Sequence, residues 1–332
     1  MTLTVARIGL GSGTLGNLFT EMTDATARTL LETAWEGGIR IFDTAPHYGL
    51  GLAERRLGAF LAELGRPAGE VRVTTKVGRL LRDNPHFTGE LDDAHSFAVP
   101  ATRRRVWDPS EVGVRASLEE SLERLGLGRV HALYLHDPDE YPDESESLRT
   151  GLAALGAVRA AGLVDQVGIG SKSTATLEAA GTHPETTELM IAGRFTLVDS
   201  SALEYCLPLC AKRGIRAVPA AIYGSGLLAR PEPQGHYDYA EAPPGVVERA
   251  RAIAAVCREH RTDLPTAALH YVDRHPSVAH IVLGARTPEQ LRQSLRRLAD
   301  PPPEELWAEL AERGLALDPA ASPAGPGSEA SG

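Results

Sequence analysis

Short apolar runs alternate with amphipathic segments along most of the chain. The runs are brief and rich in aliphatic residues, which is typical of parallel strands that are buried on both faces. They lie at 5–10, 39–43, 71–77, 131–136, 166–170, 188–192, 215–221 and 279–283. The pattern therefore predicts eight strands.

The segments between these runs carry helix signals. Residues 24–38 begin with Asp24, a candidate N-cap, and end in two glycines. Residues 108–128 open with Asp, Pro and Ser, and 147–162 and 287–299 show the same amphipathic character. Strands that alternate with helices in this way favour an α/β fold, a single (β/α)8 TIM barrel, with its active site at the C-terminal face of the strands.

Three stretches depart from the alternation. Residues 78–108 and 223–245 follow predicted strands and lack clear periodicity, so we expect both to lie as loops over the C-terminal face. Residues 316–332 are rich in Pro, Ala, Gly and Ser, which is typical of a disordered tail. We therefore expect the barrel to occupy residues 1–315.

Composition narrows the class of protein. The chain has 332 residues, a net charge of -10 and a pI near 5.6, which argues against nucleic acid or an anionic membrane as a partner. No apolar run is long enough to cross a membrane, and the N-terminal residues lack a signal-peptide profile. Together with three cysteines, which cannot all pair, these features predict a cytoplasmic protein.

Neither the cysteines nor the histidines indicate a metal site. Cys206 and Cys210 lie four positions apart on a predicted helix, and we expect both to be small, buried side chains. The eleven histidines are scattered and form no metal-binding motif. We expect no metal, and the sequence leaves the oligomeric state open.

Residues 11–16, GSGTLG, match the glycine pattern of a dinucleotide-binding fold. That fold requires a helix to open directly after the glycines. Instead NLFTEMTD intervenes before the helix signal at Asp24. We therefore expect these glycines to let the backbone pass close to a ligand at the barrel mouth.

Four polar residues stand at or just beyond the ends of consecutive predicted strands. They are Asp43, Tyr48, Lys76 and His136. Each one alone has an ordinary structural explanation, but strand ends of a barrel converge on one face, so their coincidence predicts a catalytic site. Lys76 would lower the pKa of the Tyr48 phenol, Asp43 would neutralise the buried ammonium, and His136 would orient a substrate oxygen.

The segments FDTAPHYG, TTKVG and LYLHDPD resemble the signature regions of the aldo-keto reductase superfamily. The resemblance covers about residues 5–300. It implies a barrel that binds NAD or NADP and uses Asp43, Tyr48, Lys76 and His136 as a catalytic tetrad, with Tyr48 transferring the proton during hydride transfer.

The same resemblance implies where the cofactor lies. VGIGSKS would contact the nicotinamide, YGSGLLA the pyrophosphate, and LGARTPEQLRQSL the adenosine end, where a helix N-terminus can hold an anion. Lys172 and Ala192 stand where the family commonly has an asparagine and a glutamine. The absence of a lysine near Gly284 favours NAD, whereas Arg286 fits the 2′-phosphate of NADP. The implied cofactor-binding residues are Ser171, Ser225, Gly226, Leu227, Gly284, Arg286, Thr287, Gln290 and Ser294.

Within the superfamily, the motifs look most like the aldose 1-dehydrogenase branch, near L-galactose dehydrogenase and pyridoxal 4-dehydrogenase. This implies NAD(P)-dependent oxidation of the anomeric hydroxyl of an aldose, of the L-fucose, L-galactose or D-arabinose type, to a lactone. An NADPH-dependent aldehyde or ketone reductase and a pyridoxal 4-dehydrogenase are the alternatives. A nucleotide-sensing subunit is a further one, although nothing in the sequence indicates a membrane partner.

Overall fold

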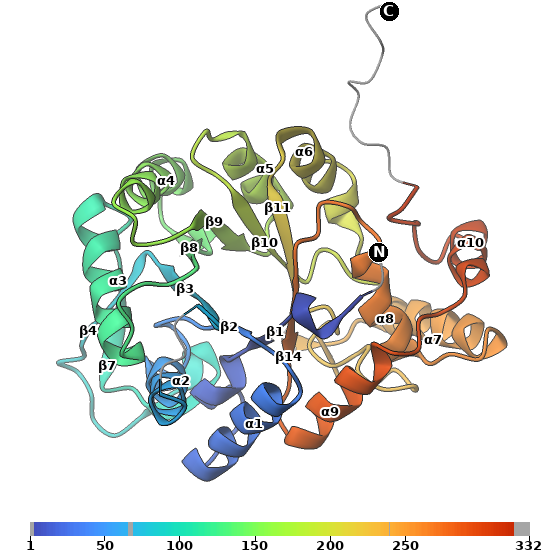
Figure 1. The fold of residues 1–332 in the computed structure, drawn as a ribbon, viewed down its shortest axis with the longest axis horizontal. Helices are drawn as coiled ribbons and strands as arrows, with labels where there is room; N and C mark the ends of the chain where they lie inside the picture. Colours follow the sequence, from blue (N-terminus) through green and yellow to red (C-terminus); the bar gives the residue numbers. More distant parts are fainter. Residues whose placement is uncertain (1–2, 66–68, 239, 322–332) are drawn as a thin grey trace, which may run out of the picture.

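A computed structural model describes residues 3–65, 69–238 and 240–321. Eight parallel strands form a closed barrel in the order β1-β14-β11-β10-β9-β8-β3-β2, which confirms the predicted fold (Figure 1). The barrel strands are β1 (Ile8–Gly11), β2 (Ile41–Asp43), β3 (Arg72–Val77), β8 (Ala132–His136), β9 (Gln166–Ser171), β10 (Glu188–Ala192), β11 (Arg216–Ala220) and β14 (Ile281–Gly284).

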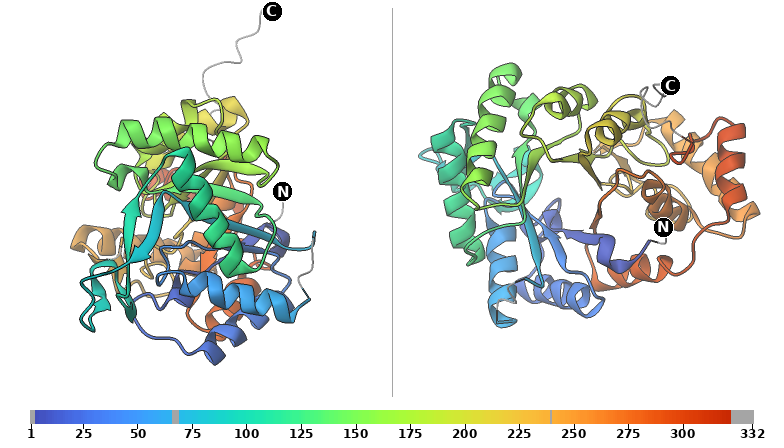
Figure 2. Two further views of the ribbon diagram at one scale, coloured as in Figure 1. Left: turned by 90° about the vertical axis from the view of Figure 1, so that its left-hand side faces the viewer. Right: turned by 45° about the horizontal axis from the view of Figure 1, so that its top comes forward.

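Helices surround the barrel, and two further views show α3 and α4 lying along its outer surface (Figure 2). In the described ranges the α-helices are α1 (Asp24–Glu36), α2 (Leu52–Glu63), α3 (Glu111–Leu125), α4 (Glu144–Ala160), α5 (Thr174–Thr182), α6 (Cys206–Arg213), α7 (Pro244–Glu259), α8 (Leu264–Asp273), α9 (Pro288–Arg297) and α10 (Glu304–Glu312). No helix in these ranges has the length and apolar content needed to cross a bilayer.

Local sequence explains most element boundaries. The Ser110 hydroxyl accepts a hydrogen bond from the amide of Gly113 at 3.1 Å and caps α3, and Gly126 ends that helix in the left-handed conformation. All five residues of β8 are buried, because the strand packs against the barrel interior on one side and helices on the other. The expected burial of Cys206 and Cys210 is confirmed.

Some predicted boundaries are wrong. The first strand begins at Ile8, since residues 5–7 form a 3-10 turn. The N-cap of α1 is Thr23, whose side chain accepts a hydrogen bond from the amide of Thr26. Asp24, the predicted N-cap, is instead the first residue of the helix.

The predicted loop at 78–108 is wrong in a way that matters for the site. It contains two antiparallel pairs, β4 (Arg79–Asp83) with β7 (Arg103–Trp107) and β5 (Leu91–Asp92) with β6 (Phe97–Pro100). The second predicted loop also contains a short pair, β12 (His236–Tyr237) with β13 (Ala240–Glu241). Pairing of β4 with β7, which are far apart in the chain, overrides the weak local pattern of the first segment, and β12 and β13 form a short local hairpin in the second.

The glycines of GSGTLG pack against the chain rather than opening a dinucleotide-binding helix. Residues Gly13–Gly16 form a 3-10 turn. A Cβ on Gly16 would lie 2.6 Å from the backbone carbon of Tyr48, and one on Gly49 would lie 2.3 Å from the Gly16 oxygen. We expected these glycines to approach a ligand. At Gly16 the close approach is instead between two backbone segments, and it holds the loop of Tyr48 against the segment that follows β1.

The end of the chain is described only in part. Asp318, within the predicted tail, forms a 2.9 Å ion pair with Arg274. Residues 322–332 of that tail lie outside the described residues.

Candidate active site

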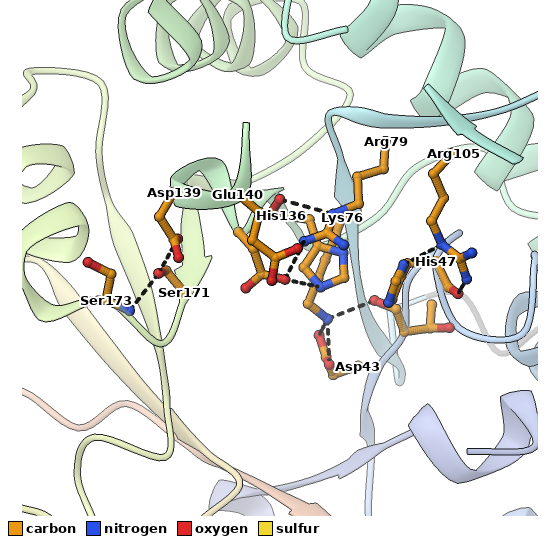
Figure 3. Close-up of polar contacts among 12 residues, drawn as sticks. Asp43, His47, Lys76, Arg79, Arg105, His136, Asp139, Glu140, Ser171 and Ser173 are labelled. Carbon is orange, nitrogen blue, oxygen red and sulfur yellow. Dashed lines mark hydrogen bonds and ion pairs between the residues drawn. The ribbon is translucent and has the colours of Figure 1, made fainter. Parts of the chain in front are cut away.

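Three strand ends and the loop that follows β2 build a polar cluster at the C-terminal mouth of the barrel. Asp43 ends β2, Lys76 is the penultimate residue of β3, and His136 ends β8. The order β2-β3-β8 makes these strands neighbours, so the three side chains emerge side by side (Figure 3). Tyr48 reaches the same place from the loop between β2 and α2.

Asp43 and Lys76 form a buried ion pair. The Lys76 ammonium donates to both Asp43 oxygens, at 3.0 and 2.8 Å, and to the Thr44 carbonyl at 3.0 Å. The Thr74 hydroxyl also donates to Asp43, at 2.8 Å. Burial lowers the pKa of Lys76, but the charge of Asp43, its hydrogen bonds and the interaction with Tyr48 together outweigh burial, so the pKa is raised above its usual value. Lys76 is a permanent cation in this site.

Tyr48 lies against this cation. The Lys76 nitrogen is 4.8 Å from the centre of the Tyr48 ring. Burial raises the pKa of the phenol and the Lys76 charge lowers it, and burial prevails, so the net shift is upward. The sequence predicts that Lys76 lowers the pKa of Tyr48. The Lys76 charge does act in that direction, but the predicted decrease is wrong because the burial of Tyr48, which the sequence does not reveal, has the larger effect. The phenol is therefore protonated at neutral pH.

His136 stands edge-on to Tyr48, with ring centroids 5.8 Å apart. Burial and the charges of Arg79 and Lys76 hold the pKa of His136 well below its usual value. The imidazole is therefore neutral, and it offers one N–H donor and one acceptor to a ligand. Its Nε2 atom lies 3.4 Å from an oxygen of Asp137.

Sequence reasoning missed Arg79 and its partners. The buried guanidinium donates to Asp137 at 2.7 Å and to Glu140 at 3.0 Å. It also lies over the ring of Trp107, 4.5 Å from the ring centroid. Burial raises the pKa of Asp137 to about 6, against the lowering effect of Arg79. The only sequence signal was position, since Arg79 and Asp137 each lie within a few residues of a predicted strand end.

Sequence reasoning also missed His47 and Arg105. The charge of the three arginines at 103–105 favours a position in solvent, but Arg105 is only 7% exposed because its position in β7 faces inward. It donates to the Nδ1 atom of His47 at 2.6 Å and pairs with Asp92. The His47 ring in turn packs edge-on against His136, with centroids 5.3 Å apart.

Ser171, the implied contact of the nicotinamide, is fully buried at the end of β9. Its hydroxyl donates to Asp139 at 2.6 Å and accepts from the amide of Ser173 at 2.8 Å (Figure 3). A hydroxyl has two acceptor lone pairs. One lone pair of Ser171 therefore remains for an N–H donor of a ligand.

The neighbouring implied contacts surround a small pocket. Lys172 and Ala192 line it together with Arg194 and Ser225. Lys172 forms a 3.5 Å ion pair with Asp238, so the position that commonly carries an amide is occupied by a paired cation. Leu227 is buried in the core, and only its backbone is available to a cofactor.

The remaining implied residues cluster between β14 and α9. The Thr287 hydroxyl accepts from the amide of Gln290 at 3.2 Å, and the Gln290 side chain accepts from the amide of Arg286 at 2.9 Å. The Arg286 guanidinium contacts the Thr20 hydroxyl and the Leu18 carbonyl. Ser294 is buried further along the helix.

Two observations fit a dinucleotide at this face. A Cβ on Gly226 or Gly284 would meet nothing within 4 Å, so the backbone borders open space at both positions. Gly226 follows β11, Gly284 ends β14, and these two strands are paired neighbours. The residues therefore suit an extended ligand that runs from Ser171 along this edge, although Lys172 and Ala192 offer it no side-chain amide.

Comparison with known proteins agrees with this geometry. The sequence model described as "Aldo/keto reductase family" matches residues 7–313. D-threo-aldose 1-dehydrogenase of Pseudomonas sp is 44% identical over 96% of this chain and 96% of its own. Pyridoxal 4-dehydrogenase of Microbacterium luteolum is 34% identical over 94% of this chain and 95% of its own.

A solved structure shares the fold. An aldo-keto reductase from Bacillus halodurans, in its holo form, superposes with a TM-score of 0.71 at 22% identity, and covers 96% of this chain and 93% of that one. At this identity the likeness speaks for the barrel alone.

Proposed function

This chain belongs to the aldo/keto reductase family and is an oxidoreductase, and from that premise we propose that it oxidises the anomeric hydroxyl of an aldose to a lactone. Family membership implies a nicotinamide cofactor. The 44% identity to a D-threo-aldose 1-dehydrogenase supports an aldose as substrate. The proposal rests most on one observation, the contact of Tyr48 with both Lys76 and His136.

In this mechanism Tyr48 transfers the proton. During oxidation the Tyr48 phenolate takes the proton of the anomeric hydroxyl as the carbon–oxygen double bond of the lactone forms. A bound nicotinamide dinucleotide would supply the acceptor for the hydride that leaves the anomeric carbon. In the reverse direction the protonated phenol donates, and the raised pKa of Tyr48 suits it to that step at neutral pH.

Lys76 and His136 assist from fixed positions. The Lys76 ammonium stabilises the phenolate, and Asp43 keeps that ammonium charged and oriented. Neutral His136 donates a hydrogen bond to the reacting oxygen and does not compete for its proton, because its pKa is held low.

The cofactor would lie along the edge that runs from Ser171 to α9. Ser171 would accept from the carboxamide, the backbone at Gly226 would border the pyrophosphate, and Arg286 would lie near the adenosine. Both NAD and NADP remain candidates, and Arg286 is the cation whose removal separates them.

Steady-state assays of the purified chain test the proposal. The panel contains L-fucose, L-galactose, D-arabinose and pyridoxal, each with NAD and with NADP. We expect at least one aldose to be oxidised, with the lactone identified by mass spectrometry. Turnover of pyridoxal alone would favour the second candidate, a pyridoxal 4-dehydrogenase, which the 34% identical relative supports. Turnover confined to the reduction of simple aldehydes would replace the proposal with a carbonyl reductase.

A further inference from the structure

His47 is the polar residue closest in sequence to Tyr48, and the proposed mechanism does not use it. Its ring centroid lies 5.3 Å from that of His136 and 6.2 Å from that of Tyr48, edge-on to both. The ring therefore borders the two groups that hold the reacting oxygen.

Arg105 determines which nitrogen of His47 carries the proton. The Nε atom of Arg105 lies 2.6 Å from the Nδ1 atom of His47 (Figure 3). A guanidinium can only donate, and it does not lose its proton in proteins. Nδ1 must therefore be the acceptor, so His47 is neutral with its proton on Nε2. The pKa of His47 agrees, because burial and the Arg105 charge hold it well below its usual value.

The arrangement that fixes this proton is buried. Arg105 donates to both oxygens of Asp92, at 2.8 and 2.6 Å, and to the His47 carbonyl at 2.9 Å. The side chains of Arg105 and Asp92 are each 7% exposed. Buried ion pairs contribute little net stability because desolvation opposes their attraction. What this pair does specify is the orientation and the tautomer of His47.

The Nε2–H group of His47 points away from Arg105 and has no hydrogen-bond partner among residues 3–65, 69–238 and 240–321. His47 is also absent from the buried groups that lack partners, so this donor is open to a ligand. The nearby donors, His136 and Tyr48, converge on the reacting oxygen. The Nε2–H group of His47 is a third donor, on a ring whose centroid lies 5.3 Å from that of His136. From there it can reach an oxygen on the carbon next to the reacting carbon.

We propose that His47, locked by Arg105 and Asp92, donates a hydrogen bond from Nε2 to the hydroxyl on the carbon next to the reacting carbon. The site thereby selects substrates with a 2-hydroxyl group. The inference rests on the proposed function for its aldose form, but the same contact forms with any 2-hydroxy aldehyde.

Substrate pairs that differ only in this hydroxyl test the contact. We expect the wild-type chain to favour 2-hydroxypropanal over propanal in reduction, and an aldose over its 2-deoxy form in oxidation. In the H47F variant the preference falls about tenfold, the usual effect of one lost hydrogen bond to a substrate. H47Q, which keeps a donor near the position of Nε2, recovers most of it. The control variants H86Q and H86F change an exposed histidine between β4 and β5 and should leave the preference unchanged.

A second measurement reads the tautomer directly. In spectra of the 15N-histidine-labelled protein, His47 should carry its proton on Nε2, and this selectivity should be lost in the D92N/R105M variant. A charged His47 or a proton on Nδ1 in the wild type would overturn the inference, as would an H47F variant that keeps the full preference. A chain that oxidises no aldose but still loses the preference for 2-hydroxypropanal over propanal in H47F would reject the proposed function alone.

Discussion

The carboxylate of Asp43 and the ammonium of Lys76 approach to 2.8 Å in a place where their side chains are only 4% and 2% exposed. The Lys76 ammonium lies beneath the ring of Tyr48. The positive charge that acts on the phenol is therefore the one that Asp43 neutralises. A buried ion pair is insensitive to the loss of both charges together but very sensitive to the loss of one.

Asp43→Asn should therefore destabilise the fold strongly. The substitution leaves the Lys76 ammonium buried without a counter-charge, which costs about 3–5 kcal/mol. Urea denaturation monitored by fluorescence measures the loss. As a control, Glu232→Gln removes one partner of the exposed pair with Arg258 and should cost about 1 kcal/mol or less. Equal losses in the two variants would contradict the role assigned to the buried pair.

Tyr48→Phe should separate binding from chemistry. The variant keeps the ring that packs against His136 but lacks the group that transfers the proton. We expect kcat to fall about 100- to 10,000-fold, while cofactor affinity, measured by quenching of intrinsic fluorescence, changes little. Tyr205→Phe, at an exposed tyrosine, should leave kcat unchanged. Retained turnover in Tyr48→Phe would remove the phenol from the mechanism.

The raised pKa of Tyr48 predicts different pH profiles for the two reaction directions. Oxidation needs the phenolate, whose fraction increases about tenfold per pH unit below the pKa. Since burial raises that pKa above its usual value of 10.0, kcat/KM for oxidation should rise throughout the range from about pH 7 to 9. Reduction uses the phenol and should change little over that range. The same profile in both directions would exclude Tyr48 as the titrating group.

The parts of the site that could be predicted are those attached to the barrel strands. Once the periodicity indicates parallel strands in a barrel, the strand ends must converge, and Asp43, Lys76 and His136 follow from their positions. Arg105 and Asp92 could not be placed in this way. They meet His47 through two antiparallel pairs, and Arg105 of β7 lies opposite Leu81 of β4, far away in the chain. The segment lacks clear periodicity, and the charge of three consecutive arginines favours an exposed loop.

Arg286→Ala should separate the two cofactors. The 2′-phosphate of NADP adds a charged group that an arginine recognises, and NAD lacks it. We therefore expect kcat/KM with NADP to fall by more than kcat/KM with NAD. Because the Arg286 side chain already contacts Thr20 and Leu18, the parallel variant Thr20→Ala checks whether loss of that contact alone has an effect. An equal decrease for both cofactors in Arg286→Ala would show that this arginine does not recognise the 2′-phosphate.

His280 should make stability depend on pH. It is 2% exposed, neither ring nitrogen has a hydrogen-bond partner in the described part of the chain, and burial lowers its pKa to about 4. In the unfolded chain a histidine titrates near 6.5. Between these values the unfolded chain binds more protons, so the free energy of unfolding decreases as pH falls from about 6.5 to 4, by up to about 3 kcal/mol for this group.

His280→Met tests this dependence. Methionine has a similar volume and leaves no unpartnered ring nitrogen, so the variant should be at least as stable as the wild type at pH 7. Its free energy of unfolding, measured by urea denaturation from pH 7 to 4.5, should fall less steeply. His275, also 2% exposed with a pKa lowered to about 4, retains its own contribution, as do His47 and His136. A matched change at exposed His86 should leave the slope unaltered, and an unaltered slope in His280→Met would mean that His280 does not contribute to it.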